Sequence, residues 1–207
     1  MVGLLDRQHI ANKIEVKSLL ESPVLANTVA KILGSRGSEE QPGAGVGVGG
    51  LVTTEYKWLR AVAKGEFTGA HTDRVYVGEG SQRLLTVWLP LGEVSPEQGA
   101  MRVLEASHRP LPGLEELREV YGRSKVGGDG TRSGWIGVEE AKAVEVSGAK
   151  WVTTTFQPGD VCVLGLDTIH MTGPNQTERL RISCDTRWQP AEDPTDPRLG
   201  RVRPVVA

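Results

Sequence analysis

Residues 179–188 read RLRISCDTRW, and this stretch decides the fold class because side chains of two kinds alternate along it. Side chains two residues apart on a strand point to the same face of a sheet. Leu180, Ile182, Cys184 and Trp188 would share one face. The other face would carry Arg179, Arg181, Ser183, Asp185 and Arg187. The pattern predicts a regular β-strand.

Further strands are expected on both sides of this one. They are rich in β-branched and aromatic residues, as strands prefer, and cover 51–62, 83–91, 100–105, 150–156 and 161–166. Turn residues such as Pro158-Gly159-Asp160 separate them. Residues 1–34 have a helical pattern, with Ser22 and Pro23 at a helix start. A short helix is expected near 113–122. The chain is thus predicted to be mainly β, a sandwich or jelly roll with flanking N-terminal helices.

One domain is expected over residues 1–207. Residues 1–50 would form a helical segment and a Gly-rich loop, 51–190 the jelly-roll core, and 191–207 a Pro-rich tail that wraps the surface. The Gly-containing stretch 111–149 is the expected lid over a site.

Charge and composition exclude several classes of partner. The formal net charge is -2, so nothing recruits nucleic acid or an anionic membrane. No apolar run approaches the roughly 20 residues that span a bilayer. Cys162 and Cys184 lie in apolar runs and are expected to be buried thiols, which indicates a reducing compartment, the cytoplasm. Gly45, Gly47 and Gly50 fit a dinucleotide-binding motif by chance, because a strand follows them instead of a helix.

Three residues are candidate metal ligands. His71 and Asp73 are two positions apart, so on an extended strand they would point the same way. His170 follows the Pro-Gly-Asp turn, at the end of a strand, and could supply a third ligand from across the sheet. Two histidines and one carboxylate form the facial triad of Fe(II) oxygenases. The tripeptide alone also fits an ordinary surface or core histidine.

Arg181 is a candidate anion ligand on the strand after His170. A guanidinium that points inward there could hold a carboxylate in bidentate fashion. The same position also fits an ordinary salt bridge, with Asp185 as its partner. Arg179 competes for the role, and spacing alone does not exclude it.

Several runs of the sequence together resemble the phytanoyl-CoA dioxygenase-like family. They are YKWLRAVAKGEFTGAHTDRVYVG, LLTVWLPLGEVSPEQGAMRVLEASHR, FQPGDVCVLGLDTIHMTGPN and RLRISCDTRWQP. The resemblance covers about 51–190. Ala106 departs from it, since the family usually has Gly there, and His108 beside it is interpreted as a turn residue.

The resemblance implies a double-stranded β-helix, with Fe(II) bound by His71, Asp73 and His170 and 2-oxoglutarate bound by Arg181. Trp88 would lie beside the co-substrate. Further pocket candidates are Thr86, Ser183 and Tyr56. For Trp88 and Tyr56, packing in the core is the alternative. Longer family members carry a further N-terminal stretch, and without it an open sheet edge would favour a homo-oligomer.

The implied function is a 2-oxoglutarate-dependent dioxygenase. It would use O2 to hydroxylate or otherwise oxidise a small organic substrate, with release of succinate and CO2. Asp73 favours oxygenation, because iron halogenases of this broad group replace that carboxylate with a small residue. The alternative is a catalytically retired metal-binding jelly roll with a binding or assembly role.

Overall fold

The computed structural model describes residues 3–34, 50–110, 134–136 and 148–205. The expected helix near 113–122 and most of the expected lid at 111–149 lie outside these residues. Helices and 3-10 turns in chain order are η1 (Gln8–Asn12), α1 (Ile14–Leu20), α2 (Pro23–Gly34), α3 (Arg74–Val77), η3 (Pro96–Gln98) and η4 (Pro197–Leu199). Strands are β1 (Leu51–Thr54), β2 (Trp58–Val62), β3 (Leu85–Pro90), β4 (Met101–Leu104), β5 (Trp151–Val152), β6 (Cys162–Gly165), β7 (His170–Thr172), β8 (Arg181–Pro190) and β9 (Val202–Pro204).

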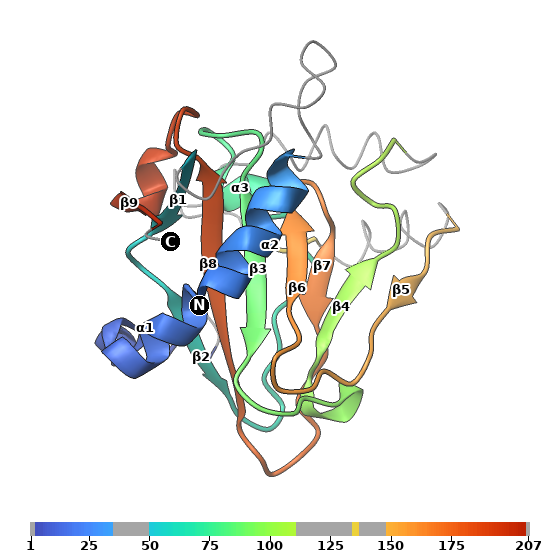
Figure 1. Cartoon of the computed structure of the whole chain (residues 1–207). Coiled ribbons are helices and arrows are strands. Elements are labelled where there is room, and N and C mark those ends of the chain that lie inside the picture. The colour runs from blue at the N-terminus through green and yellow to red at the C-terminus, as the bar shows by residue number, and fades with distance from the viewer. Residues whose placement is uncertain (1–2, 35–49, 111–133, 137–147, 206–207) are drawn as a thin grey trace.

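Two antiparallel sheets make up the described fold, which is the predicted mainly β jelly-roll architecture without closure into a barrel. The larger sheet has the order β6-β3-β8-β1-β9, and β2 also pairs with β8. The smaller sheet has the order β5-β4-β7. Figure 1 shows the long strand β8 beside β3, with α2 crossing in front of them. Of the helices in the described ranges, none combines the length and the apolar character that crossing a bilayer requires.

Strand β8 organises the larger sheet because it has a paired neighbour on each side. Residues 183–188 pair with β3, while 181–185 pair with β2 and 188–190 with β1. Its alternation is as predicted. Cys184 and Trp188 are fully buried in an apolar cluster, while Arg181, Asp185 and Arg187 line a cavity on the opposite face.

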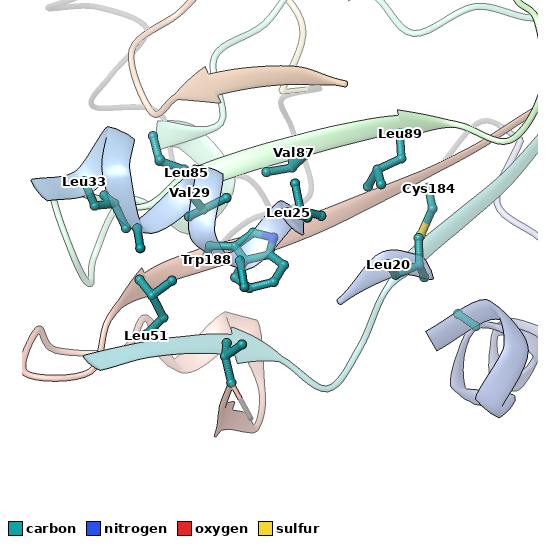
Figure 2. Close-up of a cluster of buried hydrophobic side chains, with 14 of the residues drawn as sticks. Leu20, Leu25, Val29, Leu33, Leu51, Leu85, Val87, Leu89, Cys184 and Trp188 are labelled. Carbon is teal, nitrogen blue, oxygen red and sulfur yellow. The ribbon is translucent and has the colours of Figure 1, made fainter. Parts of the chain in front are cut away.

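The apolar face of the larger sheet is covered by α2 (Figure 2). This helix begins at Pro23, where the Leu25 N–H donates a 3.3 Å hydrogen bond to the Ser22 hydroxyl. Leu25, Val29 and Leu33 recur at helical spacing and pack against Trp188. Burying a large apolar side chain stabilises a fold by roughly 1.5–3 kcal/mol. The packing of α2 therefore stabilises β8 from the apolar face of the sheet.

The expected strand over 51–62 is interrupted, because residues 55–57 leave the sheet between β1 and β2. The cause is Lys57, whose ammonium is buried and forms a 2.9 Å ion pair with Glu21. A buried charge needs such a partner, and the partner comes from the loop between α1 and α2.

The expected surface tail after Pro190 is instead partly built into the sheet. Its β9 pairs antiparallel with β1, with Thr53 opposite Arg203. The Arg203 guanidinium also forms an ion pair with Glu21. The end of the chain therefore covers the β1 edge of the sheet.

Candidate metal centre

Three side chains from different elements converge between the two sheets. The Asp73 Oδ1 atom lies 3.8 Å from His71 Nε2 and 4.0 Å from His170 Nε2. All three residues are buried, and one ligand atom from each lies within 4.8 Å of the others. The structure therefore brings together the three residues that the sequence pattern singled out as candidate ligands.

The local backbone differs from the predicted strand at this point. His71 forms a single antiparallel bridge with His170, through two reciprocal N–H to carbonyl hydrogen bonds of 3.0 Å. Asp73 has helical dihedral angles (φ -69°, ψ -20°) and is the N-cap residue directly before α3. His170 is the first residue of β7, not the last residue of a strand. The chain turn at Asp73, not strand alternation, therefore directs its carboxylate toward the histidines.

Both imidazole rings are oriented by backbone carbonyls. His71 Nδ1 lies 2.7 Å from the Gly69 carbonyl oxygen, and His170 Nδ1 lies 2.9 Å from that of Thr168. A carbonyl only accepts, so each Nδ1 carries the proton and each Nε2 presents a lone pair. This is the second contact that metal-binding histidines usually make.

The protonation states suit a cation. Burial and the neighbouring His170 lower the pKa of His71 to about 4, so its ring is neutral at physiological pH. Burial alone would raise the pKa of the Asp73 carboxyl. The guanidinium of Arg187, both imidazoles and the Thr86 hydroxyl outweigh it and hold that pKa below its ordinary value. Imidazole nitrogens together with one ionised carboxylate fit a divalent transition metal.

Asp73 is held in turn by the larger sheet. The Thr86 hydroxyl on β3 donates a hydrogen bond to Asp73 Oδ2. Arg187, which is paired with Thr86 in the sheet register, places its Nη2 atom 3.5 Å from the same carboxylate. Thr86 was predicted beside the co-substrate, and the structure gives it a direct contact with the candidate ligand.

A cavity of about 540 Å³ opens beside the three candidate ligands. The described residues that line it are Trp58, Arg60, Thr68, His71, Asp73, Tyr76, Val77, Trp88, Met101, Gly134, Trp135, His170, Met171, Thr172, Arg181, Asp185, Arg187 and Arg198. Its size falls in the range of small-molecule sites, and its lining combines aromatic rings with a few charged groups.

Arg181 is fully buried and faces this cavity. Its Nη1 atom donates a 2.7 Å hydrogen bond to the Gly99 carbonyl. Its Nε and Nη2 atoms have no hydrogen-bond partner among the described residues. Burial lowers the pKa of Arg181 to about 10, which leaves it charged. A buried cation with free donors is the arrangement that an anionic ligand would complete.

The two alternatives for Arg181 can now be compared with the geometry. Asp185 forms a 2.9 Å ion pair with Arg60, a residue of β2. Arg179 is exposed, precedes the strand and is not among the residues that line the cavity. Of the three charged residues at this end of the stretch, Arg181 is the one that offers free donors to the cavity.

The other predicted pocket residues divide into two groups. Trp88 is buried and lines the cavity, and its Nε1 atom has no partner among the described residues. Ser183 is fully buried with its hydroxyl likewise unpartnered there, yet it does not line the cavity. Tyr56 is 43% exposed and also lies outside the lining; its ring packs edge-on against Trp58 at 5.0 Å. Trp58, two residues after Tyr56, lines the cavity instead.

Other cavity residues escaped the sequence reasoning. Trp135 lies against Gly69, where an added Cβ would come within 2.5 Å of the indole. The Ile136 N–H donates to the Ala70 carbonyl at 2.6 Å, which fixes this short segment beside His71. Its position follows from contacts far along the chain and had no local signal. Arg187 did have one, since it shares the alternating face of Arg181.

Comparisons with known proteins agree with this arrangement. The family model described as phytanoyl-CoA dioxygenase (PhyH) matches residues 3–183. The solved structure of SnoN, a non-heme alpha-ketoglutarate-dependent epimerase from nogalamycin biosynthesis, aligns with a TM-score of 0.59 at 18% identity, over 97% of this chain and 68% of SnoN. SnoK, the carbocyclase of the same biosynthesis, aligns with a TM-score of 0.60 at 18% identity, over 92% of this chain and 64% of SnoK.

A second SnoN structure, in complex with Fe3+, alpha ketoglutarate and nogalamycin RO, aligns with a TM-score of 0.59 at 20% identity and covers 94% of this chain and 65% of that one. At these identities the likeness concerns the fold. The chain spans about two thirds of the length of these structures. The search of curated proteins gave no match.

Proposed function

Since the chain belongs to the phytanoyl-CoA dioxygenase family, we propose that it is an Fe(II)- and 2-oxoglutarate-dependent oxygenase that hydroxylates a small organic substrate. The observation that supports this most directly is the position of Arg181. A buried guanidinium with free donors faces the same cavity as the three candidate metal ligands. A dicarboxylate such as 2-oxoglutarate needs both a metal at one end and a cation at the other.

His71, Asp73 and His170 are proposed as the Fe(II) ligands, through Nε2, a carboxylate oxygen and Nε2. Their fit rests on ring orientation and charge: both Nδ1 atoms face backbone carbonyls, which leaves each Nε2 available as a ligand, and the carboxylate is ionised. Three protein ligands leave positions open for co-substrate and O2. Thr86 would orient Asp73 through its hydroxyl.

Arg181 is proposed to bind the distal carboxylate of 2-oxoglutarate, with Trp88 beside it. The free Trp88 Nε1 donor is a candidate further contact to that carboxylate, whereas Ser183 lies outside the cavity lining and is not proposed for this role. Tyr56 is not proposed for this role because its side chain is exposed outside the cavity. Each proposed contact would satisfy a buried polar group that has no partner among the described residues.

When bound, iron with 2-oxoglutarate and O2 supplies the oxidation of a C–H bond, with release of succinate and CO2. The protein's share is to orient the two ends of the co-substrate and to keep water away from the reacting atoms. Three tryptophans, Trp58, Trp88 and Trp135, supply much of that apolar surface. Asp73 keeps a carboxylate at the metal, which favours hydroxylation over halogenation.

The organisation of the protein is part of the proposal. Residues 1–207 would form one oxygenase domain, with a jelly-roll core at 51–190 and a tail at 191–207. Its partners would be a small-molecule substrate and O2, with a homo-oligomer formed through a sheet edge. A cytoplasmic location is consistent with two free cysteines, Cys162 and Cys184.

The test is anaerobic loading with Fe(II) and 2-oxoglutarate, followed by exposure to O2 and quantification of succinate. We expect succinate from the wild type and none above background from Asp73→Ala, because loss of the carboxylate removes a metal ligand. A wild type that binds iron but releases no succinate would favour the retired metal-binding protein. Wild-type turnover by Asp73→Ala would remove Asp73 from the ligand set.

The mass of the converted substrate separates hydroxylation from related outcomes. A gain of one oxygen atom supports hydroxylation. Loss of two hydrogen atoms indicates ring closure or desaturation, and an unchanged mass with altered stereochemistry indicates epimerisation. Candidate substrates can be ranked first by how much each one increases succinate release.

A further inference from the structure

A second arginine of the cavity has no assigned ligand. Arg187 is 8% exposed and lies on the same face of β8 as Arg181. Its Nε and Nη1 atoms have no hydrogen-bond partner among the described residues. Burying a cation with unsatisfied donors raises the free energy of the folded protein. A ligand that satisfies these donors would therefore bind with a gain in free energy.

The surroundings of Arg187 leave these donors open to the cavity. Its Nη2 atom lies 3.5 Å from the Asp73 carboxylate, a distance at the long limit for a hydrogen bond. The guanidinium carbon lies 4.8 Å from the centre of the Trp58 ring, so the ring covers one face of the group. Stacking of this kind holds a guanidinium flat and leaves its edge for oxygen acceptors.

Arg187 is separate from the site proposed for 2-oxoglutarate. Arg181 is six residues away on β8, which corresponds to about 20 Å between Cα atoms at a rise of roughly 3.3 Å per residue. Arg187 pairs with Thr86, which contacts Asp73, whereas Arg181 is the first residue of β8. The co-substrate's distal carboxylate therefore cannot satisfy both.

The charges around the cavity leave room for one more anion. The charged arginines and aspartates of the described lining are Arg60, Arg181, Arg187, Arg198, Asp73 and Asp185. Arg198 is also paired with the buried Asp196 at 2.7 Å. With Asp196 included, four arginines face three aspartates, so a net charge of +1 remains. This charge persists after loading, because Fe(II) and 2-oxoglutarate carry equal and opposite charges.

We propose that Arg187, stacked on Trp58, binds an oxyanion of the primary substrate, a carboxylate or a phosphate, next to the metal centre. The proposal deepens the proposed function and rests on it. The substrate class is then a small, partly apolar acid, since the remaining described lining includes three tryptophans, Tyr76, Val77 and two methionines. The anion at Arg187 would fix which carbon of the substrate faces the iron.

The test uses matched pairs of probes that differ in charge. Calorimetry under anaerobic conditions measures binding of benzoate, benzamide, phenyl phosphate and phenol to the full chain, both metal-free and loaded with Fe(II) and 2-oxoglutarate. We expect each anion to bind more tightly than its neutral partner. Arg187→Met should raise the Kd of the anions about ten- to a hundredfold, as loss of charged hydrogen bonds does, and leave the neutral probes unchanged.

Two variants serve as controls. Arg179→Met removes an exposed arginine outside the cavity and should bind every probe as the wild type does. Arg187→Lys keeps the charge without the planar donors and should fall between wild type and Arg187→Met. Circular dichroism checks that each variant is folded. If Arg187→Met does not fold, the lysine variant and the charge preference of the wild type still decide the question.

Three outcomes would overturn the proposal. In the first, the wild type does not prefer the anions or binds none of the probes. In the second, Arg187→Met binds anions as tightly as wild type. In the third, Arg187→Met weakens the binding of 2-oxoglutarate as much as Arg181→Met does, which would assign Arg187 to the co-substrate. A wild type that binds anions through Arg187 but neither iron nor 2-oxoglutarate would refute the proposed function and leave the oxyanion site standing.

Discussion

Replacing Arg181 by methionine should weaken co-substrate binding without destabilising the protein. The guanidinium is fully buried, and two of its three nitrogens are free for a ligand. Truncating one side of a buried charged contact costs about 2–4 kcal/mol, which raises the Kd of 2-oxoglutarate about 30- to 1000-fold. Fe(II) affinity should stay the same, because Arg181 contacts none of the three candidate ligands among the contacts described.

The effect of this substitution on folding should be small. Arg181→Met removes a single hydrogen bond, to the Gly99 carbonyl, worth about 1 kcal/mol. It also removes two buried donors that have no partner among the described residues, and an apolar side chain of similar length fills the same space. The free energy of unfolding of the ligand-free protein should therefore stay within about 1 kcal/mol of wild type.

The assay combines two measurements on the same preparations. Anaerobic titration of Fe(II)-loaded protein gives the Kd of 2-oxoglutarate, and urea unfolding of ligand-free protein gives stability. Arg179→Met is the matched control, because its side chain is exposed and outside the cavity. A structural role for Arg181 would be indicated by lost stability with unchanged 2-oxoglutarate affinity. The same loss of affinity in Arg179→Met would show that the wrong arginine was chosen.

Three further expectations concern the surroundings of the site. Thr86→Val should lower Fe(II) affinity about tenfold in a chelator competition, because the hydroxyl that orients Asp73 is lost. Ala106→Gly should raise the free energy of unfolding in urea by about 0.5–1 kcal/mol, because Ala106 has a φ of 55°, a conformation that glycine adopts without strain. Acid should destabilise the metal-free protein. The pKa of His71 is about 4 in the folded chain, against the ordinary histidine value of 6.5, so the unfolded chain takes up the proton first as the pH falls. The free energy of unfolding should then fall by up to about 3 kcal/mol as pH drops through that interval, whereas a flat urea profile would place His71 in a less buried setting.

The sequence predicted β8 well because its signal is local. Period-two alternation needs only the strand itself, and both faces are buried against different partners. Arg181 and Trp188 were therefore assigned to opposite faces correctly. Ala106, where the family usually has Gly, has a φ of 55°, a conformation that Gly adopts without strain, but no backbone prediction was made for it.

Local geometry around the candidate ligands was predicted less well. His71 and Asp73 were expected on one strand, yet Asp73 is the N-cap of the four-residue helix α3. A helix that short has no periodicity to detect. Tyr56 was expected near the pocket, but its direction depends on the break at 55–57. That break is set by Lys57 and its ion pair with Glu21, a contact that no window around Tyr56 contains.

Strand β8 connects the apolar core to the candidate site, because it contributes side chains to both. One face packs Cys184 and Trp188 under α2, and the other holds Arg181 and Arg187 in the cavity. Burying two cations beside a cavity is unfavourable, and the strand tolerates it because its backbone is paired on both sides and its apolar face is fully covered. The donors are therefore held in place before any ligand arrives, so little ordering is needed on binding. Such a strand would hold the proposed metal centre and the two proposed anion sites at fixed distances, which is what selection of one C–H bond would require.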